Sequence, residues 1–255
     1  MSVYQRLLQI AERRGAGFFV LLDPDEHPKV DLIGCAERAE DGGADALLLG
    51  GSLVRTGVID NLVREIKQRV TLPVITFPGD AGQLTRYADA VLFMSLLSGR
   101  NPEYLIGEQV KGAPLVKEYD LEAIPTAYLL IESGSLTSVQ HLSQTQPLPR
   151  NKPELVKAHA LAAQYFGMKL VYLEAGSGAR YAVPEEIINA VCEQVSLPII
   201  CGGGLRNPKQ AAARVAAGAS FIVIGNRFQE RDGLALLTEF AAAIHQGERA
   251  RTERI

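Results

Sequence analysis

The sequence lacks tryptophan and has only three cysteines and three methionines in 255 residues. The cysteines, Cys35, Cys192 and Cys201, form no CxxC pair and share no spacing with histidine of the kind that a structural zinc site needs. This pattern predicts a reduced, cytoplasmic protein and excludes the small zinc-bound domains.

An excess of one charge is also missing. The chain has 26 basic and 29 acidic residues, for a formal net charge of −3, which excludes the basic surface of a nucleic-acid-binding protein. The first apolar run, residues 18–22, is too short for a signal peptide or a membrane span. With 47% hydrophobic and 22% charged residues, the composition is that of an ordinary globular protein and excludes a disordered one.

Short apolar, β-branched runs alternate with longer amphipathic stretches along the whole chain. None of the runs alternates apolar with polar residues, so both faces of each strand must be covered. Eight strands are predicted, at residues 17–22, 44–49, 73–76, 88–93, 124–131, 169–173, 198–201 and 220–224. Helices are predicted between them, at residues 30–41, 58–69, 154–165, 184–195, 208–217 and 230–243. The order predicts an α/β protein, a single-domain (β/α)8 TIM barrel over residues 1–255.

An internal repeat and a polar segment are two further features of the sequence that concern the fold. The segments GADALLLGGS and LPVITFPGD in the first half resemble GMKLVYLEAGSG and LPIICGGG in the second, as if four βα units were repeated once. Residues 132–152, rich in Ser, Thr, Gln and Pro, are predicted to form a long loop.

The segments that follow the strands are expected to build the active site, as in other barrels of this kind. After the last two strands come the glycine turns Gly202–Gly204 and Gly225-Asn226. Bare backbone N–H groups followed by a helix N-terminus, here with Asn207 as N-cap and Pro208 as the first helical residue, are typical of a phosphate site. The alternative is that these glycines only permit tight turns.

Carboxylates follow two other strands. Glu174 is a candidate general base, metal ligand or partner of Arg180. Asp23 and Asp25 end the first strand, where they are candidates for holding a divalent cation or for a solvated turn. No histidine, serine, lysine or cysteine has the context of a nucleophile, which disfavours covalent catalysis.

Taken together, the strand-end motifs resemble the geranylgeranylglyceryl phosphate synthase family, including its bacterial relatives. The motifs are LLDPDEH (residues 21–27), GGS (50–52), YLEAGSG (172–178), CGGGLRNP (201–208) and IGNRF (224–228). The resemblance implies a modified barrel in which a loop replaces the third helix, and FPGDAGQL (77–84) is indeed too short for a crossover helix. It also implies an enzyme of membrane lipid biosynthesis. Such an enzyme joins the C3 hydroxyl of sn-glycerol 1-phosphate to C1 of geranylgeranyl diphosphate, forming an ether and releasing pyrophosphate.

The same resemblance assigns roles to residues. Mg²⁺ would be the cofactor, held by Asp23 with Ser52 near the diphosphate, and Glu174 together with Asp23 would be catalytic. Glycerol phosphate would bind to Tyr172, Leu173, Glu174, Ala175, Gly176, Ser177, Gly178, Gly203, Gly204, Gly225 and Asn226.

The prenyl chain requires an apolar groove, for which residues 91–97, residues 104–106 and the loop near Phe77 are candidates. Two positions depart from some relatives: Leu21 stands where they have lysine, and Tyr104 where they have tryptophan. The resemblance further leads us to expect a homo-oligomer, and the lipid product implies transient membrane contact.

Three other interpretations stay open at this stage. One is a synthase for a longer, heptaprenyl donor. Another is a phosphate-binding barrel isomerase or lyase, which would need a second acid or base but no metal and no groove. The third is a barrel that binds phosphorylated lipid without catalysis.

Overall fold

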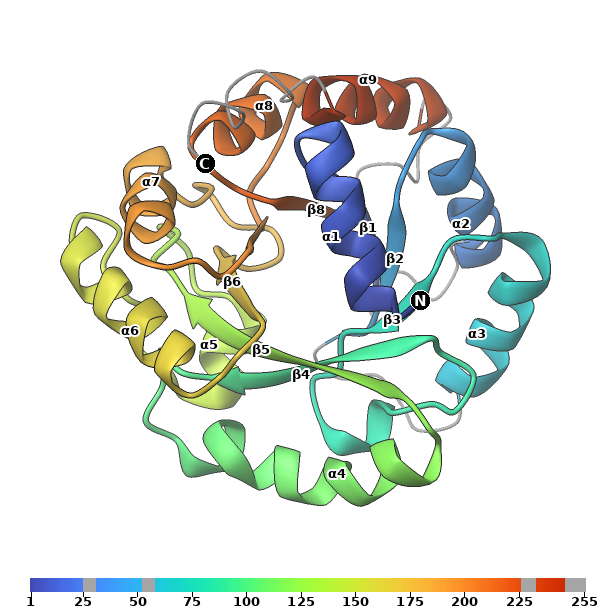
Figure 1. The fold of residues 1–255 in the computed structure, drawn as a ribbon, viewed down its shortest axis with the longest axis horizontal. Coiled ribbons are helices and arrows are strands. Elements are labelled where there is room, and N and C mark those ends of the chain that lie inside the picture. Colours follow the sequence, from blue (N-terminus) through green and yellow to red (C-terminus); the bar gives the residue numbers. More distant parts are fainter. Residues whose placement is uncertain (25–30, 52–57, 226–232, 246–255) are drawn as a thin grey trace.

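A computed structural model of the chain describes residues 1–24, 31–51, 58–225 and 233–245, and these residues form a closed parallel barrel (Figure 1). The eight strands pair in chain order, and β8 closes the barrel against β1. They are β1 (Gly17–Leu22), β2 (Ala46–Leu49), β3 (Val74–Thr76), β4 (Ala90–Leu96), β5 (Glu122–Leu130), β6 (Leu170–Glu174), β7 (Ile199–Gly202) and β8 (Phe221–Gly225). The predicted fold class is confirmed, and each predicted strand overlaps one of these eight.

Helices surround the barrel. They are α1 (Val3–Arg14), α2 (Leu32–Asp41), α3 (Val58–Arg69), α4 (Glu108–Glu118), α5 (Ser138–Ser143), α6 (Pro153–Tyr165), α7 (Glu185–Gln194), α8 (Pro208–Ala216) and α9 (Gly233–His245). Only a short 3-10 turn, η1 (Ala81–Gln83), lies between β3 and β4. The predicted loss of the third crossover helix is therefore confirmed.

Two predictions about helices were wrong or incomplete. Residues 132–152 are not a continuous loop, because α5 forms there behind Thr137, whose side chain accepts a hydrogen bond from the Gln140 N–H. The sequence pattern also missed α4, which contains Gly112 and Pro114, two residues that disfavour a helix interior. A π-helical turn, η2 (Glu103–Gly107), leads into it.

The barrel has two apolar layers because both faces of its strands are buried. On β1, Phe19 points into the barrel while Phe18 and Val20 point outward to the helices. The interior layer continues through Leu48 and Ile75 on the next two strands. This two-residue period decides which side chain of each strand end reaches the interior.

The end of the barrel where the strands begin is closed. Helix α1 lies across it, dark blue in Figure 1, with Leu7 and Ala11 buried in the interior layer. The helix starts with a capping box at Ser2, and its first N–H groups donate to the Glu122 carboxylate at the start of β5. Any site for substrates must therefore lie at the opposite end, where the strands finish.

No helix among the described residues is long and apolar enough to cross a bilayer.

Candidate active site

A cavity of about 540 Å³ occupies the end of the barrel where the strands finish. Residues that follow seven of the eight strands, together with the last residue of β8, contribute to its wall. They include Asp23 after β1, Gly50 and Gly51 after β2, Phe77 after β3, Gly176 after β6, Gly203 after β7, and Gly225 at the end of β8. The structure thus brings together the strand ends that the sequence singled out.

Glu174, the last residue of β6, points into this cavity and is only 6% exposed. Its Oε1 accepts a hydrogen bond of 2.5 Å from the Gly176 N–H. Burial raises the pKa of this carboxyl to about 7, although the backbone of Gly176, the nearby Tyr172 hydroxyl and the backbone of Ala175 act in the opposite direction. A carboxyl with a pKa near 7 can accept a proton at neutral pH, as a general base must.

The suggested pairing of Glu174 with Arg180 is not observed. The Arg180 guanidinium lies over the ring of Tyr181, 5.2 Å from its centroid. Of the three interpretations of Glu174, the structure leaves the general base and the metal ligand.

The turn after β7 has the backbone of a phosphate-binding turn. Gly203 and Gly204 have φ values of 81° and 69°, a region that strongly favours glycine. A Cβ atom at position 203 would overlap Glu174 Oε1, and one at position 204 would lie 2.8 Å from the Ala182 nitrogen. Any side chain here would fill the space beside the carboxylate.

Helix α8 follows this turn in the predicted way. It begins at Pro208, and Asn207 Oδ1 accepts a 2.9 Å hydrogen bond from the Gln210 N–H as the N-cap. Gly225 also lines the cavity, whereas the predicted partner Asn226 lies outside the described residues.

Most of the residues predicted to bind glycerol phosphate line the cavity: Tyr172, Glu174, Gly176, Ser177, Gly178, Gly203, Gly204 and Gly225. Leu173 and Ala175 are exceptions, because their side chains are buried in the outer layer between the barrel and the helices. The alternation of side chains along β6 explains the difference, since only every second residue can face inward. A contact of either residue with glycerol phosphate would therefore be made by its backbone, and the assignment stays a prediction.

The expected magnesium site is only partly described. Asp23 lines the cavity and is largely buried, while Ser52 and Asp25 lie outside the described residues. Within the described ranges no three His, Cys, Asp or Glu side chains gather as a metal cluster. Mg²⁺ commonly uses one or two carboxylates and takes its other ligands from water and substrate phosphates. Asp23 could supply one such carboxylate.

An apolar groove leads from the cavity to α4. Leu92 and Met94, on the inner face of β4, line it together with Val91 and Phe93 on the outer face of the same strand. Both faces contribute because η1 stands where a helix would cover β4. Tyr104 also lines the groove, as predicted. The predicted residues Leu105 and Ile106 are not among the lining residues, and Ile106 is exposed at the surface.

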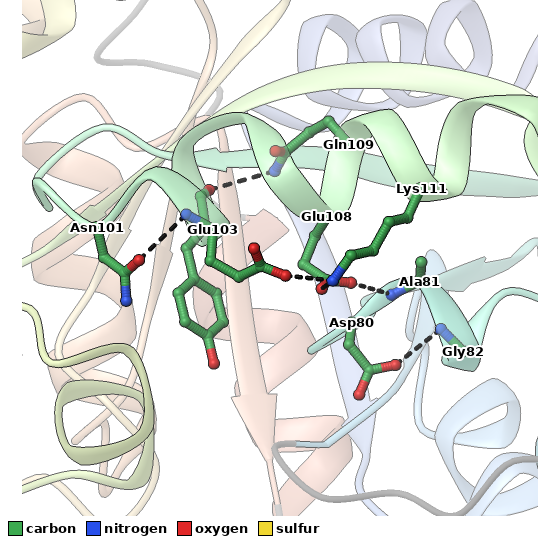
Figure 2. Close-up of polar contacts among 9 residues, drawn as sticks. Asp80, Ala81, Gly82, Asn101, Glu103, Glu108, Gln109 and Lys111 are labelled. Carbon is green, nitrogen blue, oxygen red and sulfur yellow. Dashed lines mark hydrogen bonds and ion pairs between the residues drawn. The ribbon is translucent and has the colours of Figure 1, made fainter.

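Two partly buried polar contacts, which the sequence did not indicate, hold the groove walls together (Figure 2). The Glu108 carboxylate at the start of α4 accepts a 2.7 Å hydrogen bond from the Ala81 N–H of η1. Burial opposes ionisation of Glu108, but hydrogen bonds from Lys111 and from the Ala81 backbone outweigh it and lower its pKa. The η1 turn is thereby fixed against α4.

The second contact holds η2 against β4. The Gln109 side-chain amide donates to the Met94 carbonyl and, at 3.2 Å, to the Tyr104 carbonyl. Farther along α4, a Cβ atom on Gly112 would come within 3.2 Å of Leu84. Helix α4 thus packs closely against Leu84 in the connection between β3 and β4, and side-chain hydrogen bonds hold the groove walls in place.

A closed (β/α)8 barrel with glycine turns after its last strands, a buried carboxylate and an adjoining apolar groove is typical of the barrel enzymes, whose active sites lie at the end where the strands finish. The chain belongs to the PcrB family, which matches residues 8–244. The resemblance read from the strand-end motifs is thereby confirmed.

Relatives of known name agree with this assignment. The chain is 41% identical over 244 residues to a geranylgeranylglyceryl phosphate synthase of Chitinophaga pinensis, with 96% of each chain covered. It is 46% identical over 231 residues to the synthase of Thermococcus kodakarensis, with 90% of each chain covered. The crystal structure of (S)-3-O-geranylgeranylglyceryl phosphate synthase from Thermoplasma acidophilum, in complex with sn-glycerol-1-phosphate, superposes with a TM-score of 0.90 at 36% identity. That match covers 96% of this chain and 99% of the other.

Proposed function

We propose that this chain is a prenyltransferase that joins the C3 hydroxyl of sn-glycerol 1-phosphate to C1 of geranylgeranyl diphosphate and releases pyrophosphate. The observation that carries the proposal is the continuity of the cavity, which connects the glycine turns, Glu174 and the apolar groove. The names of the relatives, and the glycerol phosphate in the Thermoplasma acidophilum complex, support the same reaction.

Glycerol phosphate would bind on the side of β6 to β8. The phosphate would accept hydrogen bonds from the backbone at Gly203, Gly204 and Gly225, where no side chain intervenes and the N-terminus of α8 is near. The glycerol hydroxyls would then face Glu174, which lies beside Gly203. Glu174 would accept the C3 hydroxyl proton as the oxygen forms its bond to carbon.

The diphosphate would bind on the side of β1 and β2, beside Asp23, Gly50 and Gly51. Asp23, with Ser52, would hold Mg²⁺, which supplies positive charge to the departing pyrophosphate. The prenyl chain would lie in the groove along β4, under Tyr104. Holding both substrates in line between these sides supplies a large part of the acceleration.

The test is pyrophosphate release from geranylgeranyl diphosphate and Mg²⁺, comparing sn-glycerol 1-phosphate with its 3-phosphate enantiomer. We expect release with the 1-phosphate only, and loss of release on chelation. Glu174→Gln should lower the rate of release. Its matched control is Glu132→Gln, at an exposed glutamate that follows β5, and this variant should behave as the native chain. Absence of release with either enantiomer, while the protein binds glycerol phosphate, would contradict the proposal and favour the isomerase or lyase.

A series of donors of increasing length tests the finer assignment. A higher kcat/KM for the heptaprenyl donor than for the geranylgeranyl donor would keep the reaction and change the substrate. The homo-oligomeric state, the cytoplasmic location and the transient membrane contact stay predictions.

A further inference from the structure

Three aromatic rings line the cavity and contact one another, which the roles proposed above do not explain. Phe77 follows β3, Tyr128 is on β5 and Tyr172 is on β6, and all three line the cavity. The ring centroids are 5.4 Å apart for Phe77 and Tyr172, 6.1 Å for Phe77 and Tyr128, and 5.3 Å for the two tyrosines. Each ring therefore contacts both others, and together they form one aromatic wall.

This aromatic wall extends from the diphosphate side to the base. At one end, the Phe77 carbonyl lies so close to Gly50 that a Cβ atom there would overlap it. At the other end, a Cβ atom on Gly202 would lie 2.6 Å from the Tyr172 hydroxyl and 2.9 Å from Glu174 Oε2. The hydroxyl and the carboxylate are thus neighbours.

The reacting carbon must lie along this wall. Attack requires the glycerol oxygen, held at Glu174, to come within about 3–3.5 Å of C1 of the donor. The diphosphate bonded to that carbon would lie beside Asp23 and Gly50, at the Phe77 end. The allylic carbons would therefore pass in front of Phe77 and Tyr128, against which the fully buried ring of Tyr172 packs.

We propose that the ring faces of Phe77, Tyr128 and Tyr172 stabilise the positive charge that develops on the allylic carbons as the donor ionises. The inference rests on the proposed function. The C1–oxygen bond breaks and its electron pair leaves with pyrophosphate. A lone pair of the glycerol C3 oxygen forms the new bond to C1, and the proton of that hydroxyl goes to Glu174. Aromatic faces attract cations, and the attraction is stronger where water is excluded, as it is around the two buried tyrosines.

The charge of the surrounding side chains agrees with this role. Arg206 is the one cationic side chain among the described residues that line the cavity, and it follows the β7 turn on the glycerol phosphate side. The strong rise in the pKa of Tyr128 and Tyr172, caused by burial and then by the Glu174 charge, keeps both rings neutral. Among the described residues that line the cavity, no cationic side chain lies on the segments that carry the three rings.

Aromatic packing elsewhere in the barrel shows what a purely structural pair looks like. Phe19 and Phe221 stack with centroids 4.9 Å apart in the interior layer, fully buried, and neither lines the cavity. Phe221 therefore provides a matched control for Phe77.

The test replaces Phe77 by phenylalanines that carry one, two, three and five ring fluorines, since each fluorine makes the ring face less negative with little change in shape. We expect kcat for pyrophosphate release to fall progressively, by about tenfold over the series. KM for both substrates and the melting temperature should stay close to native. The same series at Phe221 should leave kcat unchanged. Phe77→Leu, which keeps an apolar side chain without a ring, should lose at least as much kcat as the pentafluoro variant.

The outcomes separate the inference from the proposed function. If the native chain releases no pyrophosphate, the proposed function fails and the inference fails with it. If the native chain is active but kcat is flat across the Phe77 series, only the inference is overturned, and a change confined to KM or melting temperature would show that the ring serves packing alone.

Discussion

Two of the carboxylates buried in the described part of the barrel lie at its opposite ends, Asp45 where the strands begin and Glu174 where they finish. Asp45 is surrounded by donors: Arg14 at 3.0 Å, His245 at 2.9 Å and the Phe18 N–H at 2.8 Å. These contacts join α1, α9 and the start of β1 around one side chain that is 4% exposed. Asp45 thus ties together the closed end of the fold.

Glu174 is buried to a similar extent but has a different environment. Its hydrogen-bond donors are neutral, and no Lys, Arg or His in the described ranges acts on it. Its carboxyl is consequently raised in pKa to about 7, with burial as the main cause. The comparison shows how the same chemical group stabilises a fold when it is paired with cations and becomes a proton acceptor when it is not.

The largest effect should come from removing the proton acceptor. Glu174→Gln keeps the shape of the side chain but cannot take up a proton, so kcat should fall by about 10²–10⁴-fold. In the native chain kcat/KM should rise with pH through about 7, because the ionised form is the active one. Steady-state kinetics across pH measure both. A Glu174→Gln variant with native kcat would show that another group accepts the proton.

The same substitution should stabilise the fold at high pH. A carboxyl with an ordinary pKa of 4.5 and a folded value of about 7 contributes its full stability below pH 4.5 and loses it as the pH rises through 7. The pKa difference corresponds to roughly 3 kcal/mol. Glu174→Gln should therefore match the native free energy of unfolding at pH 4 and exceed it by about that amount at pH 8. Chemical denaturation at the two pH values decides this, and equal stability at both would contradict it.

Asp45→Asn should change the free energy of unfolding in the opposite direction. It removes the charge that pairs with Arg14 and weakens the hydrogen bonds with His245 and the Phe18 N–H, so the free energy of unfolding should fall by about 2 kcal/mol. The turnover of the folded variant should stay native, because Asp45 lies at the closed end, away from the cavity. Denaturation curves and kcat measured on one preparation test both statements, and a loss of kcat without a loss of stability would contradict the division of roles.

The smallest effect concerns Arg14 alone. Its side chain is 51% exposed, so the ion pair with Asp45 is largely screened by solvent, and Arg14→Ala should cost less than about 1 kcal/mol. Added salt should reduce the difference between native and variant. A loss as large as that of Asp45→Asn would show that the arginine, and not the full set of donors, holds the closed end together.

The strands were predictable because each had to be apolar on both faces. The strand-end position of Glu174 and the helix start at Pro208 followed from the same pattern and from cap chemistry. The helix α4 was missed because Gly112 and Pro114 weaken its local signal, and tertiary packing compensates for them. A motif does not record which residues of a strand face inward, so the sequence could not show that the Leu173 side chain lies in the outer layer.

Other features depend on contacts that are distant in the sequence. The hydrogen bond from Ala81 to Glu108 spans 27 residues, and the pair of His245 and Asp45 spans 200. Neither residue of either pair carries a local pattern that points to its partner. The aromatic wall likewise requires the register of β5 against β6, which sets Tyr128 opposite Tyr172.

The short turn between β3 and β4 has a consequence for the stability of the protein when a prenyl donor is bound. A full crossover helix would bury the outer face of β4, and without it Phe93 on that face is only partly buried and lines the cavity. A bound hydrocarbon tail would occupy that gap as a removable piece of the core, adding apolar burial that the chain itself does not supply. The bound tail and the barrel would then form one continuous hydrophobic layer. Each donor that fits should therefore raise the melting temperature in proportion to the length of tail that it buries.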